Sequence, residues 1–142
     1  ADGAHNGQVH AVGDGHGLEH ELSAYDTTVT HGAGLACLFP AWMEYVYDAN
    51  PARFAQYGYE VFGLAPTGDI ESDALSAIDE TRMFFASLGM PISLGELGLD
   101  EDNIEDAIAE MIPTLRENKG EPFGSFKKLT MEDAAEIYRL AL

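Results

Sequence analysis

Three histidines near the start of the sequence have the residue type and spacing best suited to chemistry. His16 and His20 are four positions apart, and His31 follows eleven positions after His20. On a helix, residues i and i+4 lie on one face, one turn apart, so both imidazoles can point the same way. Neutral imidazole is a good ligand for zinc, iron and nickel. With Glu19 and Asp26, the three histidines form a dense polar cluster that suggests a metal site.

The same spacing also has an ordinary interpretation. A His-x3-His pair is common by chance, and isolated histidines are more often surface or core residues than ligands. A shared site requires a tight turn through residues 27–30 that folds His31 back beside the first pair. The segment after His31 contains Gly32, Ala33, Gly34 and Ala36, whose small side chains allow close backbone approach. From spacing alone, both interpretations stay open.

Other reactive side chains are predicted to be structural. Cys37 is the only cysteine, which excludes a disulfide framework and a Cys-based zinc finger. It lies in an apolar run and is expected to be an inert core thiol. His5 and His10 lie in a Gly-rich stretch and are expected to be incidental. No Walker loop, G-x-G-x-x-G after a strand or G-x-S-x-G motif is present, so the chain has no visible nucleotide-binding machinery.

Composition limits the class of protein. The chain has 142 residues, of which 46% are hydrophobic, enough for one domain with a sizeable core. Seven Lys and Arg stand against 25 Asp and Glu, a formal net charge of −18. Such a surface repels nucleic acid and anionic lipid. No apolar run reaches the roughly 18 residues of a membrane span. These features predict an acidic, globular, cytoplasmic domain.

Helical periodicity dominates the elements that must position the cluster. Residues 1–15 contain four glycines and lack apolar periodicity, which predicts a flexible N-terminal segment. Pro40 is expected to kink or restart its helix, and Pro113 to disturb the end of another. With no convincing strand pair, the fold class is all-α, with five to six helices around the apolar segment after His31. Helices are predicted at residues 16–26, 31–48, 51–63, 70–88 and 102–117, and from Thr130 onward.

Several helix ends carry local signals. Gly63 and Gly89 are predicted stops, and Asp69 is a predicted N-cap. Thr130 with Asp133 three positions later forms an approximate capping box. Within residues 70–88, helical spacing predicts one broad apolar face made of Ile70, Ala74, Leu75, Ile78, Met83, Phe84 and Phe85.

Several segments together resemble one protein family. EHELSA (residues 19–24), THGAGLA (30–36) and FPAWM (39–43) are similar to the C-terminal part of the iron-containing alcohol dehydrogenases, in the butanol dehydrogenase-like branch. FFASLGMP (84–91), LGELG (94–98) and LTMED (129–133) agree, so the resemblance covers nearly the whole chain. EHELSA and PAWM argue against a zinc-dependent glycerol dehydrogenase-like or dehydroquinate synthase-like relative.

The resemblance implies a domain, a reaction and cofactors. Residues 16–142 would form the all-α metal-binding C-terminal domain, of the dehydroquinate synthase-like kind. The family pairs this domain with an N-terminal α/β nucleotide-binding domain, which is absent here, and holds NAD(P) and a divalent metal, iron or sometimes zinc, in the cleft between them. The full protein would interconvert small alcohols and aldehydes or ketones, and it is compatible with a homo-oligomer. The fragment alone would be inactive.

The resemblance also assigns the histidines. It implies four metal ligands, one Asp and three His, of which the Asp and the first His lie upstream of this chain. The other two map onto His16 and His31. A further family histidine near the nicotinamide and substrate maps onto His20, which implies a catalytic and cofactor-binding role outside the ligand set. The gap from His20 to His31 is one residue longer than the family pattern, so the turn at residues 26–30 is expected to bulge.

The residue types suit this chemistry. A divalent metal polarises a carbonyl oxygen as hydride arrives, and an imidazole such as His20 can relay the alcohol proton. A second hypothesis, from another class, is a stand-alone acidic helical module that binds a metal or a partner without catalysis. The missing nucleotide domain and half-complete ligand set favour it. An upstream Gly-rich βαβ region in the same gene would decide for the dehydrogenase.

Overall fold

The described part of the chain is built of helices. The computed structural model describes residues 16–142, so the predicted flexible segment at residues 1–15 lies outside the described residues. Between residues 16 and 142, the one strand-like feature is an isolated antiparallel bridge between Phe123 and Leu129. The predicted all-α class is therefore confirmed. No helix in this range is long and apolar enough to cross a membrane.

The predicted helices are all present, with ends within two residues of those expected. The first described helix covers residues 16–25. It is followed by α2 (His31–Val46), the 3-10 turn η1 (Tyr47–Ala49), α3 (Pro51–Phe62), α4 (Ile70–Ser87), the 3-10 turn η2 (Leu94–Leu97), α5 (Ile104–Lys119) and α6 (Met131–Leu140).

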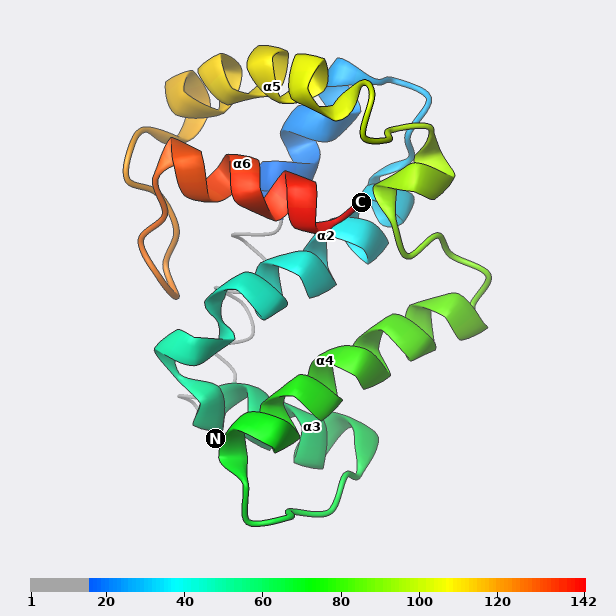
Figure 1. The fold of residues 1–142 in the computed structure, drawn as a ribbon, viewed down its shortest axis with the longest axis vertical. Coiled ribbons are helices and arrows are strands. Elements are labelled where there is room, and N and C mark those ends of the chain that lie inside the picture. The colour runs from blue at the N-terminus through cyan, green and yellow to red at the C-terminus, as the bar shows by residue number, and fades with distance from the viewer. Residues whose placement is uncertain (1–15) are drawn as a thin grey trace.

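Helix α2 lies at the centre of the arrangement. It packs against α4 on one side and α6 on the other. Figure 1 shows α3 and α4 side by side below α2, while α5, α6 and the helix at residues 16–25 lie together above it. The molecule therefore has a helical hairpin on one side of α2 and the helix that carries His16 on the other.

The core forms around the apolar segment after His31, as predicted. Trp42 of α2 is fully buried, with ring centroids 6.2 Å from Phe54 and 5.8 Å from Phe126. Apolar burial on several sides is the main stabilising contribution to such a core. The indole Nε1 of Trp42 is the one buried side-chain nitrogen or oxygen without a partner in the described residues.

Neither internal proline ends its helix. Helix α2 continues through Pro40 to Val46 without a restart, and α5 continues six residues beyond Pro113 to Lys119. Proline removes one helical N–H and crowds the preceding turn. In α5, Met111 and Leu115 are buried on either side of Pro113. The packing of both flanking turns therefore offsets the cost of the hydrogen bond that proline removes. The sequence pattern alone does not give the size of this packing contribution.

The predicted broad apolar face of α4 is also wrong in part. Ala74 and Ile78 are buried, but Ile70, Leu75, Met83 and Phe84 are exposed, Met83 by 62% and Phe84 by 50%. The main packing partners of α4 are α3 and α2. Its buried stripe is therefore narrow. That stripe includes two polar residues, Asp73 and Thr81, and each is hydrogen-bonded to a tyrosine hydroxyl of α3.

Asp73 is one of these buried polar residues of α4. Its carboxylate accepts hydrogen bonds from the Thr67 backbone N–H at 3.1 Å, from the Thr67 hydroxyl at 2.5 Å and from the Tyr59 hydroxyl. The bonds from Thr67 and Tyr59 lower the pKa of Asp73. The carboxylate thereby fixes the loop between α3 and α4.

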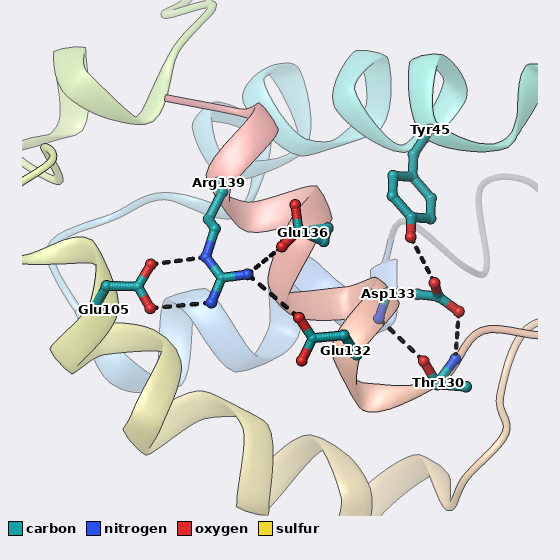
Figure 2. A network of polar contacts seen from close by, with 7 residues as sticks. All are labelled: Tyr45, Glu105, Thr130, Glu132, Asp133, Glu136 and Arg139. Atoms are coloured by element: carbon teal, nitrogen blue, oxygen red, sulfur yellow. Dashed lines mark hydrogen bonds and ion pairs between the residues drawn. The ribbon is translucent and has the colours of Figure 1, made fainter.

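The predicted capping box at α6 is confirmed. The Thr130 hydroxyl accepts from the Asp133 backbone N–H at 3.1 Å, and the Asp133 carboxylate accepts from the Thr130 N–H at 2.8 Å (Figure 2). The same carboxylate accepts from the Tyr45 hydroxyl of α2 at 2.5 Å. This pair therefore starts α6 and anchors it to the central helix.

Arg139 joins α6 to α5. Its guanidinium donates to both carboxylate oxygens of Glu105, at 2.7 and 3.0 Å, and also contacts Glu136 and Glu132 (Figure 2). Bidentate arginine–carboxylate geometry is stronger and more specific than a single contact. One cation thus offsets part of the acidic charge concentrated on these two helices.

Candidate metal centre

The two predicted ligands, His16 and His31, meet in the structure. His16 is the first described residue of the helix at residues 16–25, and His31 is the first residue of α2. Nδ1 of His16 lies 2.8 Å from Nε2 of His31, and the two rings stack with centroids 4.6 Å apart. Both side chains are exposed. The pair is therefore accessible to an ion and to ligands from another part of a protein.

The turn after residue 25 brings His31 back to His16. The Asp26 N–H donates to the Leu22 carbonyl at 2.9 Å, and the Val29 N–H donates to the Asp26 carbonyl at 3.1 Å. The Asp26 carboxylate accepts from the Thr28 hydroxyl and N–H, at 2.5 and 3.0 Å. These bonds from Thr28 lower the pKa of Asp26. The predicted tight turn is thus present, and the buried side chain of Val29 anchors it.

The start of α2 sets the direction of His31. Thr30 is the N-cap residue, and its hydroxyl accepts from the Ala33 backbone N–H at 3.2 Å. Threonine at this position satisfies one of the free N–H groups that begin every helix. His31 is consequently held in the first turn.

Glu19 lies behind the histidine pair. The sequence places it in the polar cluster without predicting a role, but the structure buries its side chain completely. One carboxylate oxygen is hydrogen-bonded to Nδ1 of His31, and the other accepts from the Ser23 hydroxyl. A buried carboxylate is costly unless it is paired and hydrogen-bonded, and both oxygens of Glu19 have partners.

Gly34 of α2 allows this burial. A Cβ atom at position 34 would lie 2.4 Å from Oε1 of Glu19 and 2.7 Å from its Cγ. Any larger residue would displace the carboxylate from His31. The predicted close approach along the small residues after His31 is therefore confirmed at Gly34.

The helix that carries His16 and Glu19 is fixed from the opposite side. Leu18 and Leu22 are fully buried. The Tyr138 hydroxyl of α6 donates to the Leu18 carbonyl at 2.6 Å, and the Asn118 side chain of α5 donates to Glu21 at 2.7 Å. His16 and Glu19 thus lie on a helix that both α5 and α6 anchor.

His20 does not contact the His16–His31 pair. It is exposed on the same helix, one turn after His16. Among the described residues, no contact joins His20 to His16 or His31. A role beside the metal, rather than on it, stays a prediction.

The pair has the donor set of an incomplete metal site. Two imidazole nitrogens that share one ion at bonds of about 2.0–2.1 Å lie about 3–3.5 Å apart. The observed 2.8 Å between the His16 and His31 nitrogens is slightly shorter, so a small opening would admit an ion. Within residues 16–142, no group of three His, Cys, Asp or Glu could hold a metal by itself. The pair therefore fits half of a four-ligand site.

Two hollows in the described surface lie away from the histidines. One, of about 480 Å³, lies between α5 and α6 beside Pro113 and Arg139. The other, of about 570 Å³, is bordered by Cys37 and the C-terminal residues. Cys37 is 2% exposed, as its predicted core position requires, and burial, with the nearby Glu96 charge, raises its pKa to about 12.

Comparison with known proteins identifies the family of this helical domain. Residues 7–142 match the model of the Fe-containing alcohol dehydrogenase family, C-terminal. The chain belongs to that family.

Individual relatives agree. NADH-dependent butanol dehydrogenase A of Clostridium acetobutylicum is 40% identical over 125 residues, which cover 87% of this chain and 31% of that protein. NADPH-dependent aldehyde reductase YqhD of Escherichia coli is 32% identical over 127 residues, 89% of this chain and 31% of that protein.

Solved structures share the fold. The crystal structure of NADH-dependent butanol dehydrogenase A from Thermotoga maritima has a TM-score of 0.78 and 36% identity, over 89% of this chain and 32% of that one. A substrate- and cofactor-free form of E. coli YqhD gives a TM-score of 0.79 and 30% identity, over 90% of this chain and 32% of that one. The chain thus spans about a third of the length of the relatives it matches.

Proposed function

We propose that this chain is the C-terminal, metal-binding part of an NAD(P)-dependent alcohol dehydrogenase that interconverts small alcohols and aldehydes or ketones. The observation that carries the proposal is the His16–His31 pair, with ring nitrogens 2.8 Å apart, in a chain of the Fe-containing alcohol dehydrogenase family. Relatives named as NADH-dependent butanol dehydrogenases and an NADPH-dependent aldehyde reductase support the substrate class and the nicotinamide cofactor.

His16 and His31 are proposed as two of four ligands to a divalent metal, iron or zinc. When bound, the metal supplies a Lewis acid that polarises the substrate oxygen. The pair presents neutral nitrogen donors on an exposed surface, where a nucleotide-binding domain would complete the ligand set and supply the cofactor site. The imidazole of His20, one helical turn from His16, is proposed to hold or relay the alcohol proton beside the nicotinamide.

The experiment compares the chain alone with the complete protein, produced with the region that precedes residue 1 in its gene. Both are supplied with Fe²⁺ or Zn²⁺, and butanal reduction is followed with NADH and with NADPH. The proposal expects metal-dependent turnover from the complete protein and none from the chain alone. Metal-independent turnover by the complete protein, or turnover by the chain alone, would contradict it.

A further inference from the structure

We propose that Glu19 is a positioning residue that fixes the tautomer and orientation of His31, so that Nε2 of His31 presents its lone pair to a metal. The inference deepens the proposed function and rests on it for the metal. It concerns a residue of this chain whose contacts can be tested without any metal.

The hydrogen-bond directions set the tautomer. An ionised carboxylate can only accept, so the bond between Glu19 and Nδ1 of His31 requires a hydrogen on Nδ1. A neutral imidazole carries one N–H, which leaves Nε2 of His31 as an acceptor. That nitrogen faces Nδ1 of His16 at 2.8 Å. In the metal-free chain, a hydrogen on Nδ1 of His16 therefore completes a relay from His16 through His31 to Glu19.

The carboxylate is held in place from several sides. Its burial removes competing water, the Ser23 hydroxyl occupies its second oxygen, and the Cα of Gly34 faces the side chain from α2. A fully buried acid that only stabilised the helix pair would need partners but no particular histidine nitrogen. Here the partner is the ring nitrogen opposite the one that faces His16.

This arrangement matches a recurring way of tuning metal sites. A histidine ligand commonly donates its other ring N–H to a carboxylate, which fixes the tautomer and ring orientation and raises the basicity of the ligand. Loss of such a partner typically weakens metal affinity by about 10- to 100-fold. We expect a reduction of this size when Glu19 cannot accept from His31.

The test begins with the metal-free chain. Two-dimensional ¹H–¹⁵N correlation of the imidazole nitrogens, recorded about two pH units above the ordinary histidine pKa of about 6.5, reports which nitrogen of His31 carries hydrogen. The wild type should show the Nδ1–H form. Glu19→Ala should revert to the Nε2–H form that imidazole side chains favour in water. Glu19→Gln, whose amide oxygen can still accept, should retain Nδ1–H.

Gly34→Ala provides a second route that keeps Glu19. The new methyl group would displace the carboxylate, so His31 should again change from the Nδ1–H to the Nε2–H tautomer. Gly32→Ala is the matched control on α2, because its Cβ would meet only the flexible end of Met90, at 3.3 Å. It should leave the His31 signals unchanged. This pair keeps the test decisive if Glu19→Ala does not fold.

The metal half of the inference is measured by titrating the same chains with Zn²⁺ alone and following the His16 and His31 ring signals. Glu19→Ala and Gly34→Ala should bind about 10- to 100-fold more weakly than the wild type, and Gly32→Ala should bind as the wild type does. An Nε2–H tautomer for His31 in the wild type, or Nδ1–H retained in both Glu19→Ala and Gly34→Ala, would overturn the role of Glu19. If a large excess of Zn²⁺ leaves the wild-type His16 and His31 signals unchanged, the proposed pair of ligands is contradicted, while the tautomer result still decides the contact with Glu19.

Discussion

The hydroxyl of Tyr138 donates a hydrogen bond to the backbone carbonyl of Leu18 at 2.6 Å, across 120 positions of sequence. Leu18 lies between His16 and Glu19, so this single bond joins α6 to the helix that carries these two residues. Tyr138 is fully buried, and burial, with the Glu21 and Glu19 charges, raises its pKa. The hydroxyl therefore stays protonated and able to donate.

Tyr138→Phe is predicted to lower the free energy of unfolding by about 1 kcal/mol, the usual net value of one buried hydrogen bond. Urea unfolding followed by circular dichroism measures it. Tyr47→Phe is the matched control, because it removes the same hydroxyl group from a tyrosine that is only half-buried. Equal stabilities of the Tyr138→Phe and wild-type chains would show that the bond contributes nothing.

Cys37 is predicted to resist alkylation in the folded chain. The residue is 2% exposed, and burial, with the nearby Glu96 charge, raises the pKa of its thiol to about 12. The reactive thiolate is therefore scarce at about pH 8. Iodoacetamide labelling, followed by mass spectrometry, should be slow in buffer and rapid in urea. Equal rates in the two conditions would refute this account.

Asp73 is predicted to make stability depend on acid pH. Hydrogen bonds from Thr67 and Tyr59 hold its pKa below the ordinary 3.8. A depressed folded-state pKa contributes stability that is fully present above the unfolded-state value and is lost as pH falls through the folded-state value. Asp73→Asn should therefore destabilise the chain at neutral pH, and the difference from wild type should shrink below about pH 4. Urea unfolding at several pH values checks this, and a difference that is constant with pH would contradict it.

The net charge of −18 predicts a stabilising effect of salt. Self-repulsion among 25 acidic residues disfavours the compact state, and salt screens it over a Debye length of about 10 Å at 0.1 M. The melting temperature should rise between low salt and about 0.3 M NaCl. A flat or falling melting temperature would indicate that local pairs, such as Arg139 with Glu105, already compensate the charge.

Local signals explain why much of the fold was predictable. The capping box at Thr130 and Asp133 acts within one turn of helix, and Gly63 ends α3 with a positive φ of 68°. Such features depend on neighbouring residues only. The contact between His16 and His31 could also be predicted from the sequence, because a turn of only a few residues joins their helices.

Tertiary contacts explain what sequence reasoning missed. A glutamate on a helix is normally solvated, and the burial of Glu19 depends on Gly34 in another helix. Phe84 has the helical spacing of a core residue but is 50% exposed, because spacing does not specify how much of a helix face its neighbours cover. The small residues after His31 indicated a close approach to this helix, but not that the side chain of Glu19 makes it.

The most direct test of the account is the metal content of the complete protein that contains this chain, purified with Fe²⁺ or Zn²⁺ and measured by inductively coupled plasma mass spectrometry. His16→Ala and His31→Ala should each abolish metal retention, because each removes one of the proposed imidazole ligands. His20→Ala is the matched control, and it should keep metal near the wild-type level while turnover falls. Full metal content in His16→Ala or His31→Ala, with the protein folded, would contradict the central claim.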